Sequence, residues 1–89
     1  MHSRTTERFR SQLTALPKAV QDKATAAYAL WSANPDHPSP RFKKVHTTLP
    51  IHSVRIDRAW RAAGIRDGDS VVWFWIGSHA SYEALLRSL

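Results

Sequence analysis

Basic side chains gather in the middle of this 89-residue chain. Residues 41–66 hold seven Lys or Arg and one acid, so this segment alone carries +6, the net charge of the whole chain. Guanidinium groups bind phosphate oxygens through paired N–H donors and stay charged at physiological pH. The segment therefore predicts a surface that binds a polyanion or an acidic protein. Its basic residues are Arg41, Lys43, Lys44, Arg55, Arg58, Arg61 and Arg66.

His79 could add proton transfer to this surface. It follows the most apolar run of the chain, Val71–Ile76, and would lie in the first turn of a helix capped by Ser78. Tyr82, three residues later, would share its helix face. A lone histidine is more often structural than catalytic, and His79 could equally close the end of the sheet by hydrogen bonding. For the other four histidines we predict only a structural role.

Two strands would present the central arginines. Alternation along a strand places Arg55 on the face of Ser53, and Arg61 on the face opposite Trp60. If these strands pair, Arg55 and Arg61 can point into one concave surface. For a single arginine, a solvated side chain or a pair with Asp57 is the simpler interpretation, but several arginines on consecutive strands favour phosphate binding.

Lys43 and Lys44 lie between Phe42 and Val45, so at least one of the two must face away from the core. They either guard an exposed edge strand against aggregation or contact phosphate.

Composition limits the class of protein. A chain of this length forms one domain, residues 1–89, with a thin core. The absence of cysteine excludes disulfides and thiolate metal sites. No apolar run approaches the roughly 18 residues of a membrane span, and residues 1–10 lack the apolar centre of a signal peptide. We therefore expect a soluble, cytoplasmic domain without a membrane partner.

Apolar spacing predicts two helices in the first third of the chain. One runs for about ten residues from Glu7, with Thr5 or Thr6 as N-cap, and ends at Pro17. The next follows directly, carries one apolar stripe from Val20 to Trp31, and stops at Asn34-Pro35. The short connection predicts a helical hairpin.

The rest of the chain predicts strands and one more helix. Strand-like stretches cover residues 42–46, 51–56, 58–64 and 70–76, with a hairpin turn at Asp67-Gly68, and a helix covers His79 to about Ser88. We predict an α+β domain in which the N-terminal hairpin packs on a small, mainly antiparallel twisted sheet of three or four strands, with a short C-terminal helix. Val71–Ile76, apolar on both faces, should lie inside the sheet, covered by the hairpin on one side and by a smaller cluster or a partner on the other.

From about Phe9 to Leu86 the chain resembles the RelE/ParE superfamily of bacterial type II toxins, and RelE- and HigB-like members most. The resemblance rests on ordered short motifs: Trp31-Ser32-Ala33-Asn34-Pro35, Phe42-Lys43-Lys44-Val45, Ser53-Val54-Arg55-Ile56, Trp60-Arg61-Ala62, and Trp73-Phe74-Trp75-Ile76-Gly77-Ser78-His79 with Tyr82. Family members often begin with a strand, whereas Met1–Thr6 is short and polar here.

The resemblance implies a toxin held inactive by a cognate antitoxin, an acidic or amphipathic segment covering the basic face. RelE-like members cut messenger RNA on the ribosome without metal or cofactor, by attack of the 2′-hydroxyl on the adjacent phosphate. By position, Arg55 and Arg61 would stabilise the phosphate, His79 would act as acid or base, and Tyr82 would stack on a base or orient the ring. Lys43, Lys44 and Arg58 would contact RNA.

Two rival functions remain open from the sequence. ParE-like members of the same superfamily inhibit DNA gyrase and cleave nothing, and they share the fold. Alternatively, the chain is a non-catalytic interaction domain whose basic face binds only an acidic protein segment. His79 and Tyr82 beside an arginine cluster favour RNA cleavage over both.

Overall fold

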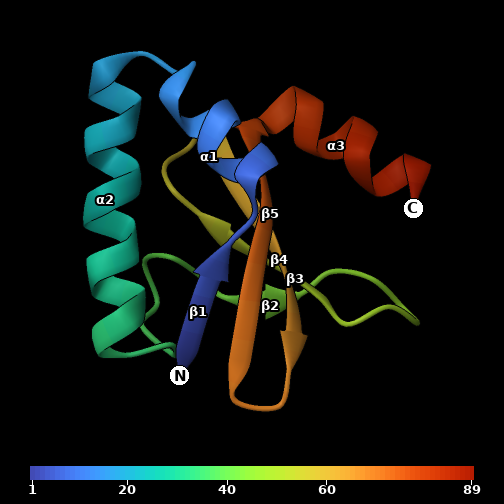
Figure 1. The fold of residues 1–89 in the computed structure, drawn as a ribbon. Helices are drawn as coiled ribbons and strands as arrows, with labels where there is room; N and C mark the ends of the chain where they lie inside the picture. Colours follow the sequence, from blue (N-terminus) through green and yellow to red (C-terminus); the bar gives the residue numbers. More distant parts are fainter.

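The computed structural model describes all 89 residues and places helices on both faces of a twisted sheet (Figure 1). This confirms the predicted α+β class, but the sheet has five strands instead of the expected three or four. The elements are β1 (His2–Thr5), α1 (Glu7–Thr14), α2 (Lys18–Ala33), β2 (Lys43–Lys44), β3 (Ile51–Arg55), β4 (Trp60–Asp67), β5 (Ser70–Ser78) and α3 (His79–Ser88).

The strand that the sequence did not predict is β1. The sheet order is β1-β5-β4-β3-β2, with β1 parallel to β5 and the other pairs antiparallel. Three of the four β1 residues are polar and exposed, because this edge strand is held mainly through its backbone. Strand recognition from sequence depends on apolar alternation, which this segment lacks.

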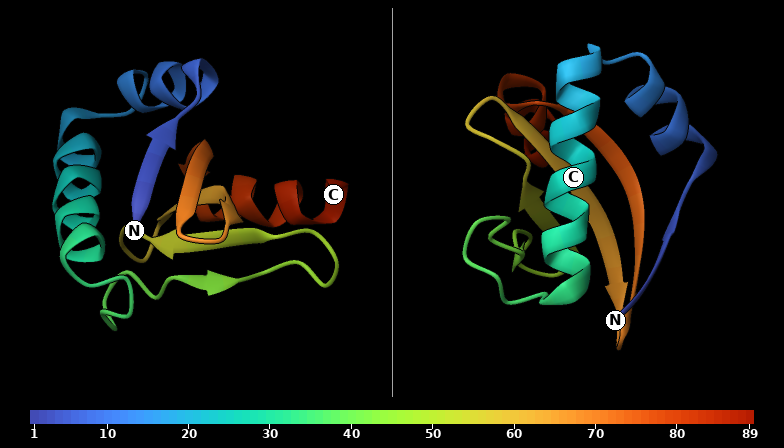
Figure 2. Two further views of the ribbon diagram at one scale, coloured as in Figure 1. Left: turned by 60° about the horizontal axis from the view of Figure 1, so that its bottom comes forward. Right: turned by 90° about the vertical axis from the view of Figure 1, so that its left-hand side faces the viewer.

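Local signals set the helix boundaries. The Thr6 hydroxyl accepts a hydrogen bond from the Phe9 N–H at 3.1 Å and caps α1. The Ser78 hydroxyl accepts from the Ser81 N–H at 3.1 Å and caps α3, as predicted. Pro17 directly precedes α2, and α1 and α2 are strongly inclined to each other (Figure 2).

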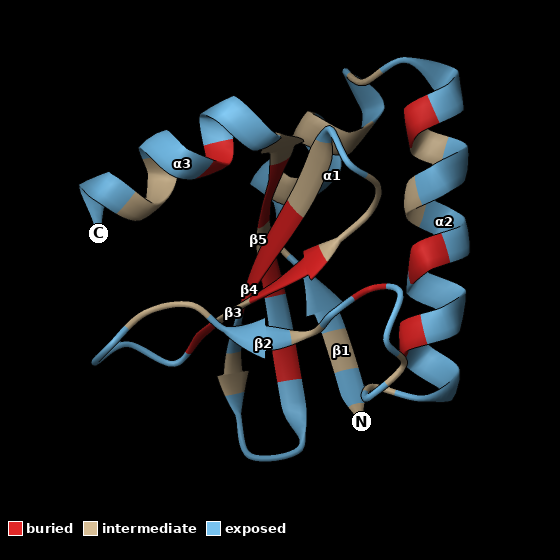
Figure 3. Cartoon of the chain, turned by 180° about the vertical axis from the view of Figure 1, so that it is seen from behind, coloured by how far each residue is buried: buried red, intermediate tan, exposed pale blue.

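Two apolar clusters sandwich the sheet. The larger contains Trp31 of α2 with Val54, Ala62, Val71, Trp73 and Ile76 of the sheet, and α1 adds Phe9 and Leu13. The smaller contains Ile51, Ala63, Trp75 and Tyr82, with Leu85 and Leu86 of α3. Buried positions accordingly follow the central strands and the side of α2 that faces them (Figure 3). This confirms that β5 lies inside the sheet with a smaller cluster on its second face.

A bulge in β5 decides which side chains face which helix. Ala63 pairs with Trp75 and Gly64 with Trp73, so Phe74 is an extra residue. Trp73 therefore faces α2, whereas Trp75 faces α3. A Cβ on Gly64 would lie 2.8 Å from Trp73 Cε3, so glycine is needed for this packing.

The β4–β5 hairpin turns at Gly68-Asp69, one residue later than predicted, because Asp67 still pairs with Ser70. Gly68 has φ 58°, a left-handed conformation that glycine adopts without a Cβ penalty.

Candidate functional site

A cavity of about 430 Å³ opens on the face of the sheet that carries α3. Side chains from the loop before β2, from β2, β3 and β4, and from α3 line it. They are Arg41, Lys43, Lys44, Val45, Ser53, Arg55, Arg61, His79, Tyr82, Glu83 and Leu86. We call this the basic cavity. The structure thus brings together six of the seven side chains selected from the sequence, whereas Arg58 is exposed in the β3–β4 turn and does not line the cavity.

Arg55 and Arg61 lie opposite each other in the antiparallel pairing of β3 and β4. Neither forms an ion pair with a carboxylate. One Nη of Arg61 donates hydrogen bonds to the main-chain oxygens of Asp57 and Trp60, the second at 3.0 Å. Burial, and then the charge of Arg55, lower the pKa of Arg61 from its ordinary value. An arginine remains protonated despite such a shift, so the cavity holds a fixed positive charge.

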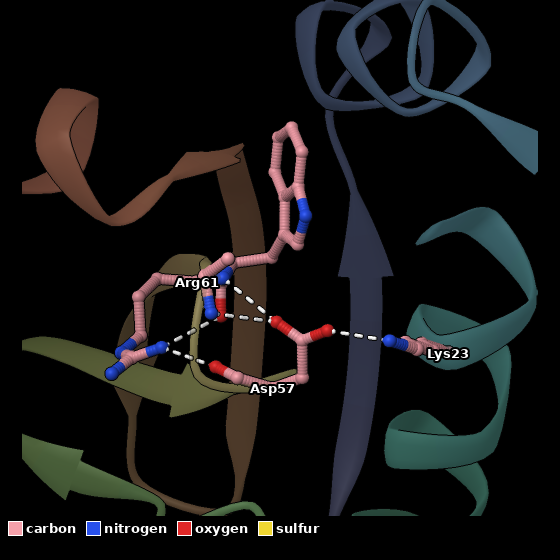
Figure 4. A network of polar contacts seen from close by, with 5 residues as sticks. Lys23, Asp57 and Arg61 are labelled. Atoms are coloured by element: carbon pink, nitrogen blue, oxygen red, sulfur yellow. Dashed lines mark hydrogen bonds and ion pairs between the residues drawn. The ribbon is translucent and has the colours of Figure 1, made fainter. Parts of the chain in front are cut away.

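The Asp57 carboxylate is turned toward Lys23 of α2 and away from the Arg61 guanidinium (Figure 4). It accepts hydrogen bonds from Lys23 Nζ at 2.9 Å and from the N–H groups of Ala59 at 2.8 Å and Trp60 at 3.1 Å. The Lys23 hydrogen bond is the main reason why the pKa of Asp57 lies below its ordinary value. Asp57 therefore fixes the β3–β4 turn and leaves the cavity arginines without an acidic partner.

His79 begins α3 at the rim of the basic cavity. Its main-chain N–H donates to the Ala59 carbonyl at 2.8 Å, which joins the start of the helix to the β3–β4 turn. The side chain is about half exposed, and its Nε2 lies 3.3 Å from Glu83 Oε1. An imidazole at this place can reach a ligand in the cavity while a carboxylate holds its orientation.

Tyr82 is almost entirely buried at the floor of the cavity. Its hydroxyl donates to Ser53 Oγ at 3.1 Å, and its ring lies 6.1 Å from His79 and 6.2 Å from Trp75. This geometry fastens α3 onto β3 and supports the imidazole from one side. Only 7% of Tyr82 is exposed, which leaves little of its ring open to a base.

Sequence reasoning left Arg41 and Glu83 out of the site. The i,i+4 spacing of His79 and Glu83 was a usable signal for a pair on one helix face. Arg41 was counted in the basic segment but was not selected as a site residue, because it follows Pro40 in an irregular loop. Glu83 is the only acid in the basic cavity.

A second cavity, of about 340 Å³, lies on the opposite face, between β1, α1, α2 and the sheet. Its lining is mostly apolar and includes Phe9, Leu13, Tyr28 and Trp31. No three His, Asp or Glu side chains come together as metal ligands would. None of the three helices is long and apolar enough to cross a membrane.

The fold and the basic cavity define a small α+β domain with a cationic site under its C-terminal helix. The chain belongs to the ParE-like toxin domain family, whose sequence model matches residues 18–84. No curated protein sequence matches it.

Solved toxin structures share this fold. YafQ from E. coli strain BL21(DE3) has a TM-score of 0.71 at 10% identity, over 90% of this chain and 94% of that one. The RelB–RelE antitoxin–toxin complex from Methanococcus jannaschii gives 0.73 at 12%, over 92% and 96%. The YoeB/ParE toxin from Agrobacterium tumefaciens gives 0.68 at 12%, over 89% and 99%. At identities this low, the matches show that the chain shares the fold of these toxins.

Proposed function

We propose that this protein is the toxin of a type II toxin–antitoxin system and acts as a metal-independent, ribosome-dependent mRNA endonuclease that arrests translation. The observation that carries the proposal is the basic cavity itself. It gathers Arg55, Arg61 and His79 with no acidic partner for either arginine. An anionic phosphate would supply the missing countercharge.

The reaction requires the cavity to assist two proton transfers and to stabilise negative charge. The 2′-oxygen of a ribose bonds to the adjacent phosphorus, the bond to the 5′-oxygen breaks, and a cyclic phosphate and a 5′-hydroxyl remain. One group must accept the 2′-hydroxyl proton and one must protonate the leaving oxygen; His79 serves one of these transfers and water the other. Positive groups must stabilise the crowded phosphorane.

The residues divide these tasks by chemistry and position. Arg55 and Arg61 hold the phosphate from the sheet, since fixed guanidinium groups suit developing negative charge. His79 transfers a proton, and its half-exposed ring gives it access to the substrate. Tyr82 and Glu83 orient the imidazole and are positioning residues. Lys43 and Lys44 contact the RNA backbone, and Arg58 does so outside the cavity.

The partner that keeps the protein inactive is proposed to be a cognate antitoxin, whose acidic or amphipathic segment covers the basic face. Its carboxylates would neutralise the cavity while its bulk excludes RNA. If the domain were only a docking module for such a segment, Arg55→Ala would weaken antitoxin binding and any toxicity would persist. The endonuclease proposal expects Arg55→Ala to weaken both.

DNA gyrase inhibition is the second candidate, favoured by the ParE-like family match. Purified protein added to ribosomes carrying a defined message, and separately to gyrase with relaxed plasmid, separates the two. We expect message cuts bearing 5′-hydroxyl ends and normal supercoiling. Blocked supercoiling with an intact message would establish the gyrase function and overturn ours.

A further inference from the structure

Arg41 adopts a backbone conformation that an L-residue with a side chain rarely takes. Its φ is 50°, and it is the only residue other than glycine with a positive φ. This left-handed region costs free energy, because Cβ comes too close to the following carbonyl oxygen. Such strain persists only where the surroundings impose it, and it gathers at functional sites.

Both neighbours of Arg41 are fixed. The Pro40 side chain is fully buried, and its carbonyl accepts the Arg55 N–H at 2.6 Å. The Phe42 ring stacks on His52 with centroids 4.8 Å apart and meets Trp31 edge-on at 5.5 Å. The backbone is thus anchored on both sides of Arg41, and the Arg41 side chain lines the basic cavity.

Within the cavity, the Arg41 guanidinium has no partner in the protein. It makes no hydrogen bond or ion pair, whereas Arg61 is held by two main-chain oxygens. Burial is the main cause that lowers the pKa of Arg61, and the charges of Arg55 and Arg41 lower it further, so both groups lie within electrostatic reach of Arg61. Arg41 is also exposed, which places its charge where a ligand would enter.

We propose that Arg41 is an additional RNA-binding residue, which holds a backbone phosphate of single-stranded RNA next to the scissile one. The inference rests on the proposed function. Arg55 and Arg61 already supply two positive charges for a single phosphodiester. Arg41, Lys43 and Lys44, from the loop before β2 and from β2, add three more, and Glu83 offsets one of them. A second phosphate, adjacent to the scissile one, would balance this excess of positive charge.

The proposed contact forms when the RNA binds and is unchanged in the transition state. Arg41 should therefore contribute to substrate binding and leave the chemical step unchanged, in contrast to Arg61. Loss of its guanidinium should raise KM about tenfold or more, the usual effect of a lost charge-assisted hydrogen bond, with kcat retained.

Arg41→Gly tests the inference, because glycine removes the guanidinium and tolerates the left-handed backbone. The probe is single-stranded RNA with 2′-O-methyl groups at every ribose, which binds and cannot be cut. We expect a higher melting temperature, an affinity about tenfold lower, and a plot of log affinity against log salt that is shallower by about 0.7, the value of one single-strand phosphate contact. Arg8→Ala, exposed on α1 across the sheet, is the control for loss of one positive charge and should leave the slope unchanged.

An unchanged affinity and salt slope for Arg41→Gly would overturn the inference. If this variant melts at a lower temperature, Arg41→Asn gives the decisive binding result, because asparagine also tolerates this conformation. If the wild type cleaves message and Arg41→Gly binds the probe normally, the endonuclease proposal stands and the role of Arg41 is contradicted. If the wild type never cleaves but Arg41→Gly loses one phosphate contact, the Arg41 inference stands and the endonuclease proposal is contradicted. Failure of the wild type to bind the free probe would overturn the Arg41 inference, whereas ribosome-dependent cleavage would stand.

Discussion

Arg55 and Arg61 lie directly opposite each other on β3 and β4, with no carboxylate between them. Like charges in cross-strand register repel and destabilise a sheet. Apolar or oppositely charged residues would pair better at this place. The repulsion between Arg55 and Arg61 lowers the stability of a domain whose core is already small. We expect such a cost at a site that must bind an anion.

Arg55→Gln should therefore stabilise the free protein while it impairs function. We expect the free energy of unfolding in urea to rise by about 0.5 kcal/mol, because the cross-strand repulsion is removed. Message cleavage should fall by roughly 10²-fold, the usual loss for one donor to a developing anion. Arg66→Gln, on β4 but outside the cavity, should show no such gain in stability. A less stable Arg55→Gln would mean that the two arginines are not in conflict.

His79 and Glu83 should differ in how completely they control the chemical step. His79→Ala is expected to lower kcat by about 10²–10⁴ with little change in KM, because a proton-transfer group is lost. Glu83→Ala should lower kcat less, since the imidazole only loses its orienting partner at 3.3 Å. Glu83→Gln keeps an acceptor oxygen and should recover much of the rate. Single-turnover cleavage measures all three, and equal losses for Ala and Gln would argue against a positioning role.

Asp57 should matter for stability through its backbone hydrogen bonds more than through Lys23. Asp57→Ala loses the side-chain hydrogen bonds to the Ala59 and Trp60 N–H groups and should cost about 1–2 kcal/mol in urea unfolding, like the loss of a helix cap. Lys23→Ala, which removes a half-exposed ion pair, should cost at most about 0.5 kcal/mol. The pKa of Asp57 is lowered below about 3.8, so its contribution is complete above that pH and is lost as the pH falls through the folded-state value. A larger effect from Lys23→Ala would reverse this ranking.

His52 should make stability depend on pH. Burial, aided by the charges of Arg66 and Lys44, lowers its pKa below the ordinary 6.5, although a hydrogen bond to the Pro50 carbonyl acts in the opposite direction. The folded state thus prefers the neutral ring. Its contribution is complete above about pH 6.5 and is lost as the pH falls through the lowered folded-state pKa.

Urea unfolding between pH 7.5 and 5 tests this dependence. The fall in unfolding free energy toward acid pH should be smaller in His52→Gln than in the wild type. The matched control is His2→Gln on the exposed edge strand β1, which should keep the full fall. Identical pH profiles for wild type and His52→Gln would show that His52 does not contribute.

Local chemistry explains what the sequence could predict. α3 begins and ends at the predicted residues because Ser78 supplies a cap and the apolar spacing that follows is helical. Strand alternation put Arg55 on the face of Ser53 and Arg61 opposite Trp60. The two were expected to share one surface if their strands paired, and the strands do pair.

Long-range geometry explains what the sequence could not predict. The polar β1 is a strand only because the edge of β5 accepts its backbone. The Phe74 bulge decides which tryptophan faces α3, and no composition signal marks it. Arg41 enters the cavity through one unusual torsion between two anchored neighbours, which depends on packing that is distant in sequence.

The central claim is that the basic cavity cuts messenger RNA, and the most direct test is to sequence RNA 5′ ends shortly after induction in cells. Wild type should produce new 5′-hydroxyl ends within translated messages and arrest growth. The double variant with Arg61→Ala and His79→Ala, expressed at an equal level, should produce neither. Cleavage and arrest that persist in the double variant, or arrest by the wild type without new ends, would contradict the account.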